Sequence, residues 1–336
     1  MLPIPEILAG GPPPPGTPIG RSREGRELYG YRFGNGPRNV SLIAGCHADE
    51  PVGPAMLDRL VCWLAGGPAD GPLLADWSFR IVPHANPDGE ARNAAWTEGR
   101  AARPDPGVYG IATYLKRVVR DLPGDDVEFG FPRGEDDREA RPENRAIAAF
   151  LATGAPYALH ASFHGMGFAA GPSFLMEAGW AGRAQAMRDN LRRKVAEMGY
   201  QLHDVDRGGD KGFHRIDQGF TTRPDSQAMV AHFEALGDEA TAALFRPSSM
   251  EYVRSLGGDP LTIVSEMPLF LLPARHYQED KVRPPAIFEL RRVADDPHAL
   301  VLELLKHGVA PMPIRDQMEL QLSYLAEALE AVANPG

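Results

Sequence analysis

Apolar runs typical of β-strands alternate with amphipathic helix patterns along most of this chain, and this alternation constrains the fold more than any other feature. The strand runs lie at 26–33, 39–44, 77–83, 157–163 and 261–265. The helix patterns lie at 54–65, 143–152, 181–198, 288–307 and 317–332. This order predicts an α/β fold in which helices cover both faces of a sheet. The segment 97–142 is polar and rich in glycine and proline, which predicts a long loop region.

Composition limits the partners of the chain. With 336 residues, of which 43% are hydrophobic and 24% charged, the chain can bury the core of a large domain. The formal net charge is −10 and no basic tract occurs, so nucleic acid is not an expected partner. No apolar run reaches the ~18–20 residues of a membrane span, so no membrane partner is expected.

The N-terminal segment carries neither the basic start nor the apolar stretch of a signal peptide. The chain contains only two cysteines, Cys46 and Cys62, which are too few for a disulfide framework. A cytoplasmic location is therefore expected. Prolines 12–15 indicate a stiff polyproline segment, which divides the chain into a lead-in over 1–18 and a single domain over 19–336.

The segment just after the strand run at 39–44 carries His47 and Glu50 with the spacing H-x-x-E. An imidazole and a carboxylate held together at a strand end are two of the three protein ligands that a catalytic zinc requires. A second pair with this spacing, His276 and Glu279, follows no expected strand and lies in a polar stretch. The context therefore favours His47 and Glu50 as the metal ligands.

A catalytic zinc keeps three protein ligands and one open position for water. His164 is the candidate for the third ligand, because it ends the strand run at 157–163 and is followed by a glycine that lets backbone approach a metal. His160 lies on the same face of that strand and is the alternative ligand, or else a core histidine. Cys46, beside His47, is expected to be a small buried residue rather than a ligand.

A zinc hydrolase also needs a base that takes a proton from water. Glu266 follows the apolar run at 261–265 directly, and no basic residue adjoins it in the sequence. A carboxylate at the end of an apolar strand fits a partly desolvated base. The alternative interpretation is a strand-end glutamate in solvent.

Together these segments resemble the zinc carboxypeptidase family, the carboxypeptidase A-like metallopeptidases, from about residue 19 to about residue 272. Residues 19–26 look like the "IG-S-x-x-GR" entry of the family, and 47–53 match its metal motif. The further matching segments are 82–89 ("P-x-x-NPDG"), 141–147 ("E-P-E-T-R-A"), 164–165 and 262–266. Their order and spacing make a chance match improbable.

This resemblance implies a mixed, mostly parallel twisted sheet of about eight strands between helices, formed by a single catalytic domain. It implies one zinc ion per chain, held by His47, Glu50 and His164. Glu266 would activate a water molecule and later protonate the leaving amine. Zinc lowers the pKa of water toward ~7, and a placed base adds about 10²–10⁴ in rate.

One expected part of the family pattern is missing. The family usually carries "D-x-N-R-N-F-P", whose Asn and Arg bind the terminal carboxylate of the substrate. The equivalent stretch is expected at 126–133, where Glu128 and Phe129 replace that pair. Another guanidinium can take over, because it binds a carboxylate through two parallel hydrogen bonds. The candidates, for each of which a surface role is the alternative, are Arg133, Arg215 and Arg223.

The resemblance also implies an arginine after N-P-D-G that polarises the scissile carbonyl. Arg92 is the nearest match, and Arg100 is the fallback. Asn93, beside Arg92, is a candidate substrate-binding residue. Tyr252, ahead of Glu266, is the candidate for the tyrosine that the family places over the substrate.

These features predict a zinc-dependent hydrolase of peptide or amide bonds, in the first place a metallocarboxypeptidase acting on small peptides. The missing Asn-Arg pair raises an alternative, a desuccinylase- or aspartoacylase-like deacylase of N-acyl amino acids. A non-catalytic zinc- or peptide-binding relative is a further alternative, disfavoured because the four central residues are retained. The expected partner is a small peptide or an acylated amino acid, and the sequence leaves the oligomeric state open.

Overall fold

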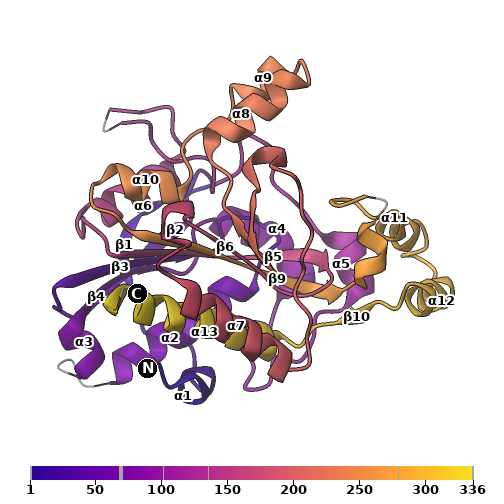
Figure 1. Ribbon diagram of the computed structural model, residues 1–336, viewed down its shortest axis with the longest axis horizontal. Helices are drawn as coiled ribbons and strands as arrows, with labels where there is room; N and C mark the ends of the chain where they lie inside the picture. The colour runs from indigo at the N-terminus through magenta and orange to yellow at the C-terminus, as the bar shows by residue number, and fades with distance from the viewer. Residues whose placement is uncertain (1, 68–70, 101, 135, 279, 335–336) are drawn as a thin grey trace.

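A ten-stranded mixed sheet forms the centre of the computed structural model, which describes residues 2–67, 71–100, 102–134, 136–278 and 280–334 (Figure 1). Its strand order is β1-β2-β4-β3-β5-β9-β6-β8-β7, and β10 pairs with β9. The strands are β1 (Thr17–Arg21), β2 (Glu27–Phe33), β3 (Arg38–Ala44), β4 (Trp77–Val82), β5 (Leu159–Ala169), β6 (Ser173–Met176), β7 (Arg215–Asp217), β8 (Phe220–Thr222), β9 (Leu261–Leu271) and β10 (Ala310–Pro311).

The middle of the sheet is parallel, and its edges are not. Strands β4, β3, β5 and β9 run parallel to one another, as do β6 and β8. The remaining pairings are antiparallel. The expected mixed α/β sheet is confirmed. Parallel pairing covers less of it than expected, and short strands such as β7, β8 and β10 raise the strand number above eight.

Helices cover both faces of the sheet. They are α1 (Ile4–Leu8), α2 (Val52–Gly66), α3 (Pro72–Asp76), α4 (Pro87–Thr97), α5 (Ile111–Arg117), α6 (Pro142–Ala152), α7 (Gln185–Glu197), α8 (Ser226–Ala235), α9 (Glu239–Ala242), α10 (Ser249–Ser255), α11 (Pro285–Arg292), α12 (Pro297–His307) and α13 (Ile314–Ala333). Helices α2, α7 and α13 pack together on one face, and α6 and α10 on the other. Successive residues of β3 point to opposite faces of the sheet. Leu42 therefore packs in the core under α2, α7 and α13, and Ile43 packs in the core under α6 and α10.

Two local expectations need correction. The expected loop at 97–142 contains helix α5, whose Tyr114 is fully buried. The expected helix at 288–307 is two helices, because Pro297 starts α12 and the Asp296 side chain caps its first turn. The N-P-D-G run forms the start of α4, where the Asn86 side chain accepts a hydrogen bond from the Gly89 amide.

The first residues of the chain are part of the packed structure. Ile7 and Leu8 of α1 are fully buried in the core beneath α2, and β1 begins at Thr17. The division of the chain at residue 18 therefore stays a prediction about domain organisation. Among the described helices, none is long and apolar enough to cross a membrane.

Candidate metal centre and active site

The end of β3 positions the first two candidate ligands. Gly45 follows the strand in the left-handed conformation, with φ of 70°, and a Cβ there would approach Glu90 and Pro54 too closely. The chain turns at this point, and His47 and Glu50 follow before α2 begins at Val52. The sequence order strand, glycine turn and helix therefore places both side chains at the carboxyl edge of the parallel sheet, where α/β proteins form their sites.

His164 completes a compact group with these two residues. Nδ1 of His47 lies 2.8 Å from Oε1 of Glu50. Nδ1 of His164 lies 2.8 Å from Oε2 of the same carboxylate and 3.0 Å from Nδ1 of His47. Two ring nitrogens and a carboxylate thus converge on one point, as the three sequence-predicted ligands should.

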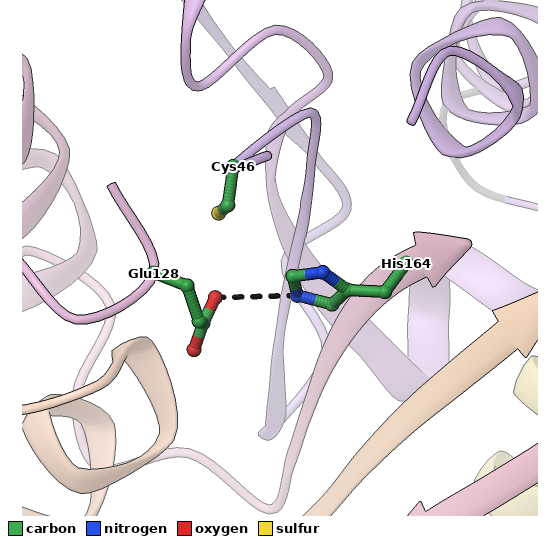
Figure 2. A group of neighbouring side chains, drawn as sticks. All are labelled: Cys46, Glu128 and His164. Carbon is green, nitrogen blue, oxygen red and sulfur yellow. Dashed lines mark hydrogen bonds and ion pairs between the residues drawn. The ribbon is translucent and has the colours of Figure 1, made fainter. Parts of the chain in front are cut away.

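The opposite nitrogens of both rings face acidic residues. Nε2 of His47 lies 3.5 Å from Oδ1 of Asp126. Nε2 of His164 lies 3.3 Å from Oε2 of Glu128 and 2.7 Å from the Ser162 hydroxyl, and Figure 2 shows the contact with Glu128. A carboxylate on the far side of a ligating imidazole fixes the ring and raises its basicity. The pattern fits metal binding through Nδ1.

Two candidate metal groups share His164 but use different sides of its ring. The first is His47, Glu50 and His164; the second is Cys46, Glu128 and His164, drawn in Figure 2. All three residues of the second group are buried, and burial together with the Glu128 charge raises the pKa of the Cys46 thiol well above its usual value. Metals bind the thiolate, so Cys46 fits the expected small buried residue, and the first group is the candidate catalytic site.

A third group with ligand chemistry lies away from the sheet, at Glu289, Glu303 and His307. The Lys306 ammonium lies 2.7 Å from Glu289 and 2.9 Å from Glu303. A lysine already neutralises these carboxylates, so we interpret the group as an ion-pair cluster. Glu279, of the second H-x-x-E pair, lies outside the described residues.

The charges in the first group are strongly coupled. Burial would lower the pKa of His164, but the Glu50 charge and hydrogen bonds to Glu128 and Glu50 raise it to about 10. Burial would raise the pKa of Glu128, but the contacts with His164 and Ser249 lower it to about 2. Glu50 is likewise held well below its usual pKa by the two histidines, against the effect of burial. The nitrogen and carboxylate donors of this group fit the ligand set of zinc.

Glu266 stands next to this group. It is the register partner of His164 on the neighbouring parallel strand β9. Within the described part of the chain its carboxylate has no hydrogen bond or ion pair. Burial and the nearby Glu50 charge raise its pKa to about 8. An unpaired carboxylate with a raised pKa beside a metal group has the properties of a general base.

A cavity of about 550 Å³ opens over these residues. Glu50 and Glu266 both line it, together with Gly165 and Met166 in the second half of β5. Arg120 lines it as well. Its Nε donates to Oδ2 of Asp49 at 2.7 Å and its Nη2 to the Tyr114 hydroxyl at 2.9 Å, which fixes the guanidinium within the cavity wall.

The other predicted site residues lie elsewhere. Six predicted residues are absent from the described lining of the cavity. They are Arg92, Asn93, Arg133, Arg215, Arg223 and Tyr252. Three of the predicted arginines are engaged by acidic groups. Arg92 contacts Glu24 and Asp121, Arg215 binds the Asp204 carboxylate through two nitrogens, and Arg223 contacts Glu177.

Arg133 and Tyr252 are held by backbone. Arg133 donates to the Phe245 carbonyl at 3.0 Å. The Tyr252 hydroxyl donates to the Ala148 carbonyl at 3.0 Å, and its ring packs on Phe131. These contacts correct the expectation that the two side chains face the substrate.

Asn93 has a structural position instead of a substrate contact. Its fully buried amide donates to the carbonyls of Ala48 at 2.8 Å and Val119 at 2.9 Å, and its oxygen accepts from the Val119 amide. It thereby ties the loop of the metal ligands to the residue before Arg120. His160 is a core histidine, hydrogen bonded to Ser41 and Ser249, rather than a ligand.

Arg120 is a candidate site residue that is not among the residues predicted from the sequence, although the sequence carries a signal for it. Arg120 is followed by Asp121, Leu122 and Pro123, which keeps the arginine and the proline of "N-R-N-F-P" at the family spacing. The expected stretch at 126–133 also lies at the site, where Asp126 faces His47. Glu128, which was expected in place of the family's asparagine, lies instead against His164.

Comparisons with known proteins agree with this fold. The family model for zinc carboxypeptidases matches residues 17–197. A Shewanella amazonensis protein assigned as a metallopeptidase has a similar structure, with a TM-score of 0.51 at 12% identity, over 97% of this chain and 88% of that one. Bovine thrombin-activatable fibrinolysis inhibitor, solved with tick carboxypeptidase inhibitor, gives a TM-score of 0.50 at 15% identity. The match covers 95% of this chain and 90% of that one. No curated protein sequence matches the chain.

The family match covers more than half of the chain, and the two solved structures share its fold. The chain belongs to the zinc carboxypeptidase family. This membership confirms the resemblance inferred from the sequence, and it makes the protein a metallopeptidase, a hydrolase of the peptidase type.

Proposed function

We propose that this protein is a zinc-dependent metallocarboxypeptidase that removes the C-terminal residue of small peptides, with one zinc ion per chain. The observation that carries the proposal is the position of Glu266. It lines the same cavity as Glu50, is the register partner of His164, and has no hydrogen bond or ion pair within the described part of the chain. Bound at those three residues, zinc would polarise the scissile carbonyl and lower the pKa of a water molecule toward ~7. A cytoplasmic location stays a prediction.

The protein's own residues would supply proton transfer and orientation. Glu266 takes a proton from the attacking water and later gives it to the leaving amine. Arg120 binds the terminal carboxylate of the substrate, because Nη1 of this arginine makes no hydrogen bond to the described residues while Nε and Nη2 are held. Glu128 keeps the His164 ring in place.

Replacing Glu266 by glutamine tests this function. We expect the variant to retain zinc at the wild-type ratio and to lose hydrolysis of short peptides by about 10²–10⁴-fold. Glu27→Gln, on the surface of β2, is the matched control and should keep full activity. Full activity of Glu266→Gln would overturn the assignment of the base.

A deacylase of N-acyl amino acids is the second candidate function. It is favoured by the cations around the cavity, which suit an acidic acyl group. Kinetics on short peptides and on N-acyl amino acids with the same C-terminal residue separate the two functions. A purely non-catalytic relative would hydrolyse neither class.

A further inference from the structure

The cavity over Glu266 has a cationic wall. The five cationic side chains that line it are Arg120, Arg207, Lys281, Arg283 and Arg291. Among the described lining residues the acids are only Glu50 and Glu266, which belong to the metal group and the base. The wall is therefore positive in a chain whose formal net charge is −10. Such a local reversal of charge concentrates anions in a cleft.

These cations come from three distant parts of the sequence. Arg120 follows α5, Arg207 lies in the segment before β7, and residues 281–291 lead into and form most of α11. Figure 1 shows α11 beside α5, and these two helices are in contact. The fold thus gathers one sign of charge at one opening from segments that share no sequence pattern.

The five cations differ in what already neutralises them. Arg120 pairs with Asp49, and Arg207 pairs with Asp210 at 2.7 Å and stacks 4.0 Å from the centre of the Phe213 ring. Lys281 donates to a backbone carbonyl. Neither Arg283 nor Arg291 has a side-chain hydrogen bond or an ion pair within the described part of the chain.

Two unpaired guanidinium groups at the rim of a cationic cavity repel the other cations, and a bound anion relieves that repulsion. Arg120 can accept one carboxylate, the terminal one. Arg283 and Arg291 remain on the same cavity. Within the described part of the chain the Asp280 charge acts on Arg283, but neither arginine has an ion pair that would compete with an acidic group of the substrate. The exposed Phe288 and Val282 beside them offer apolar surface to the methylene groups that would carry it.

We propose that the substrate carries a second carboxylate in addition to its terminal one, and that Arg283 and Arg291 bind this second carboxylate. The proposal rests on the hydrolase function proposed above and deepens it. Two substrate classes share this chemistry: a peptide that ends in aspartate or glutamate, and an amino acid with a dicarboxylic N-acyl group such as succinyl. The experiment below distinguishes the two classes by testing a charged and a neutral compound from each.

The first arm compares isosteric substrates. Zinc-loaded enzyme is assayed on N-benzoyl-glycyl-glutamate against N-benzoyl-glycyl-glutamine, and on N-succinyl-leucine against N-butyryl-leucine. We expect kcat/KM to favour the charged member of one pair by about two- to fivefold, as a partly exposed ion pair allows. The pair that shows the preference identifies where the second carboxylate lies.

The second arm changes the arginines. Arg291→Gln and Arg283→Gln should each move the charged-to-neutral ratio toward one, and the double variant should abolish the preference. Arg292→Gln is the matched control, because Arg292 is exposed on the same helix and is absent from the described lining. It removes the same charge and should keep the wild-type ratio.

The third arm does not depend on catalysis. Calorimetry on Glu266→Gln compares N-acetylglutamate with N-acetylglutamine, and N-succinylglycine with N-butyrylglycine. We expect tighter binding of the acid in one pair, lost in the background of Arg283→Gln and Arg291→Gln. Equal affinities in both pairs would overturn the inference. Preferred binding of an acid without hydrolysis of any substrate would contradict the proposed function but not this inference.

Discussion

His164 and Glu266 are direct register partners on the adjacent parallel strands β5 and β9. Neighbouring strands lie about 4.8 Å apart, so the sheet itself fixes the distance from a predicted metal ligand to the predicted base. Both residues lie inside their strands and not at the ends, because β5 continues to Ala169 and β9 to Leu271. A rigid element therefore holds the base, which is the arrangement that a precise reaction geometry requires.

Shortening the base tests this geometry. In Glu266→Asp the carboxylate stays in the cavity but withdraws by one methylene, and a displacement of about 1 Å can cost about 10²-fold in rate. We expect kcat to fall by about that factor while zinc content and KM change little. Steady-state kinetics with metal analysis of the same samples measure both. A fall in zinc content parallel to the fall in kcat would contradict the separation of base and ligand.

The sheet and the convergence of the candidate ligands His47, Glu50 and His164 were largely predictable from the sequence, and the reason is local. The run before His47 is apolar and flanked by turn residues, so the end of β3 at Ala44 is where the pattern predicts it. The second halves of β5 and β9 were missed because glycines, Pro268 and the site residues themselves interrupt the apolar pattern. Strand signals fail at functional positions, where the residue choice serves chemistry.

The substrate side of the site was not predictable in the same way. The cavity arginines at 120, 207 and 283 lie in polar segments without periodicity, whereas Arg291 lies on helix α11, and only the tertiary fold brings the four together. The arginines favoured by their closeness to family motifs, Arg92 and Arg133, are engaged elsewhere. An arginine carries no local signature of what it binds, whereas an H-x-x-E pair after a strand does.

Glu128 provides a test of how the ligand ring is positioned. Its Oε2 lies 3.3 Å from Nε2 of His164, and its Oε1 accepts hydrogen bonds from the amide and hydroxyl of Ser249. In Glu128→Gln the shape is kept but the charge behind the ring is lost. We expect zinc affinity to fall about 10–100-fold, measured by competition with a chromophoric chelator. Glu289→Gln is the control, and an unchanged affinity in Glu128→Gln would show that the contact does not tune the ligand.

Arg120 is predicted to recognise the terminal carboxylate. Hydrogen bonds to a charged group contribute about 1.5–3 kcal/mol, so Arg120→Gln should lower kcat/KM for peptides with a free C-terminus by about 10–100-fold. The kcat/KM of Arg120→Lys should lie between the values of the wild type and of Arg120→Gln, because lysine keeps the charge but not the paired hydrogen-bond donors of the guanidinium. Arg117→Gln, an exposed neighbour on α5, is the control. An equal loss of rate on C-terminally amidated peptides would indicate a structural defect instead.

His160 should make the stability of the protein depend on pH. This histidine is fully buried between Ser41 and Ser249, and burial lowers its pKa to about 4 from 6.5. Between these two pH values the unfolded chain binds a proton that the folded chain does not, so stability rises with pH across the window. The contribution is complete above about pH 6.5 and is lost as the pH falls toward 4. The shift corresponds to about 3 kcal/mol.

Urea unfolding of zinc-free protein at several pH values measures this slope. His203 is half-buried, and desolvation lowers its pKa to about 4 as well. The wild-type slope therefore contains both histidines, and the comparison must be between variants. His160→Asn keeps a polar side chain between the two serines and should flatten the slope between pH 6.5 and 4.5. His298→Asn changes an exposed histidine and should leave the slope as it is. If His160→Asn retained the full wild-type slope, His160 would not be the neutral buried group, because removing a group that does not protonate in the folded state must remove its share of the proton linkage.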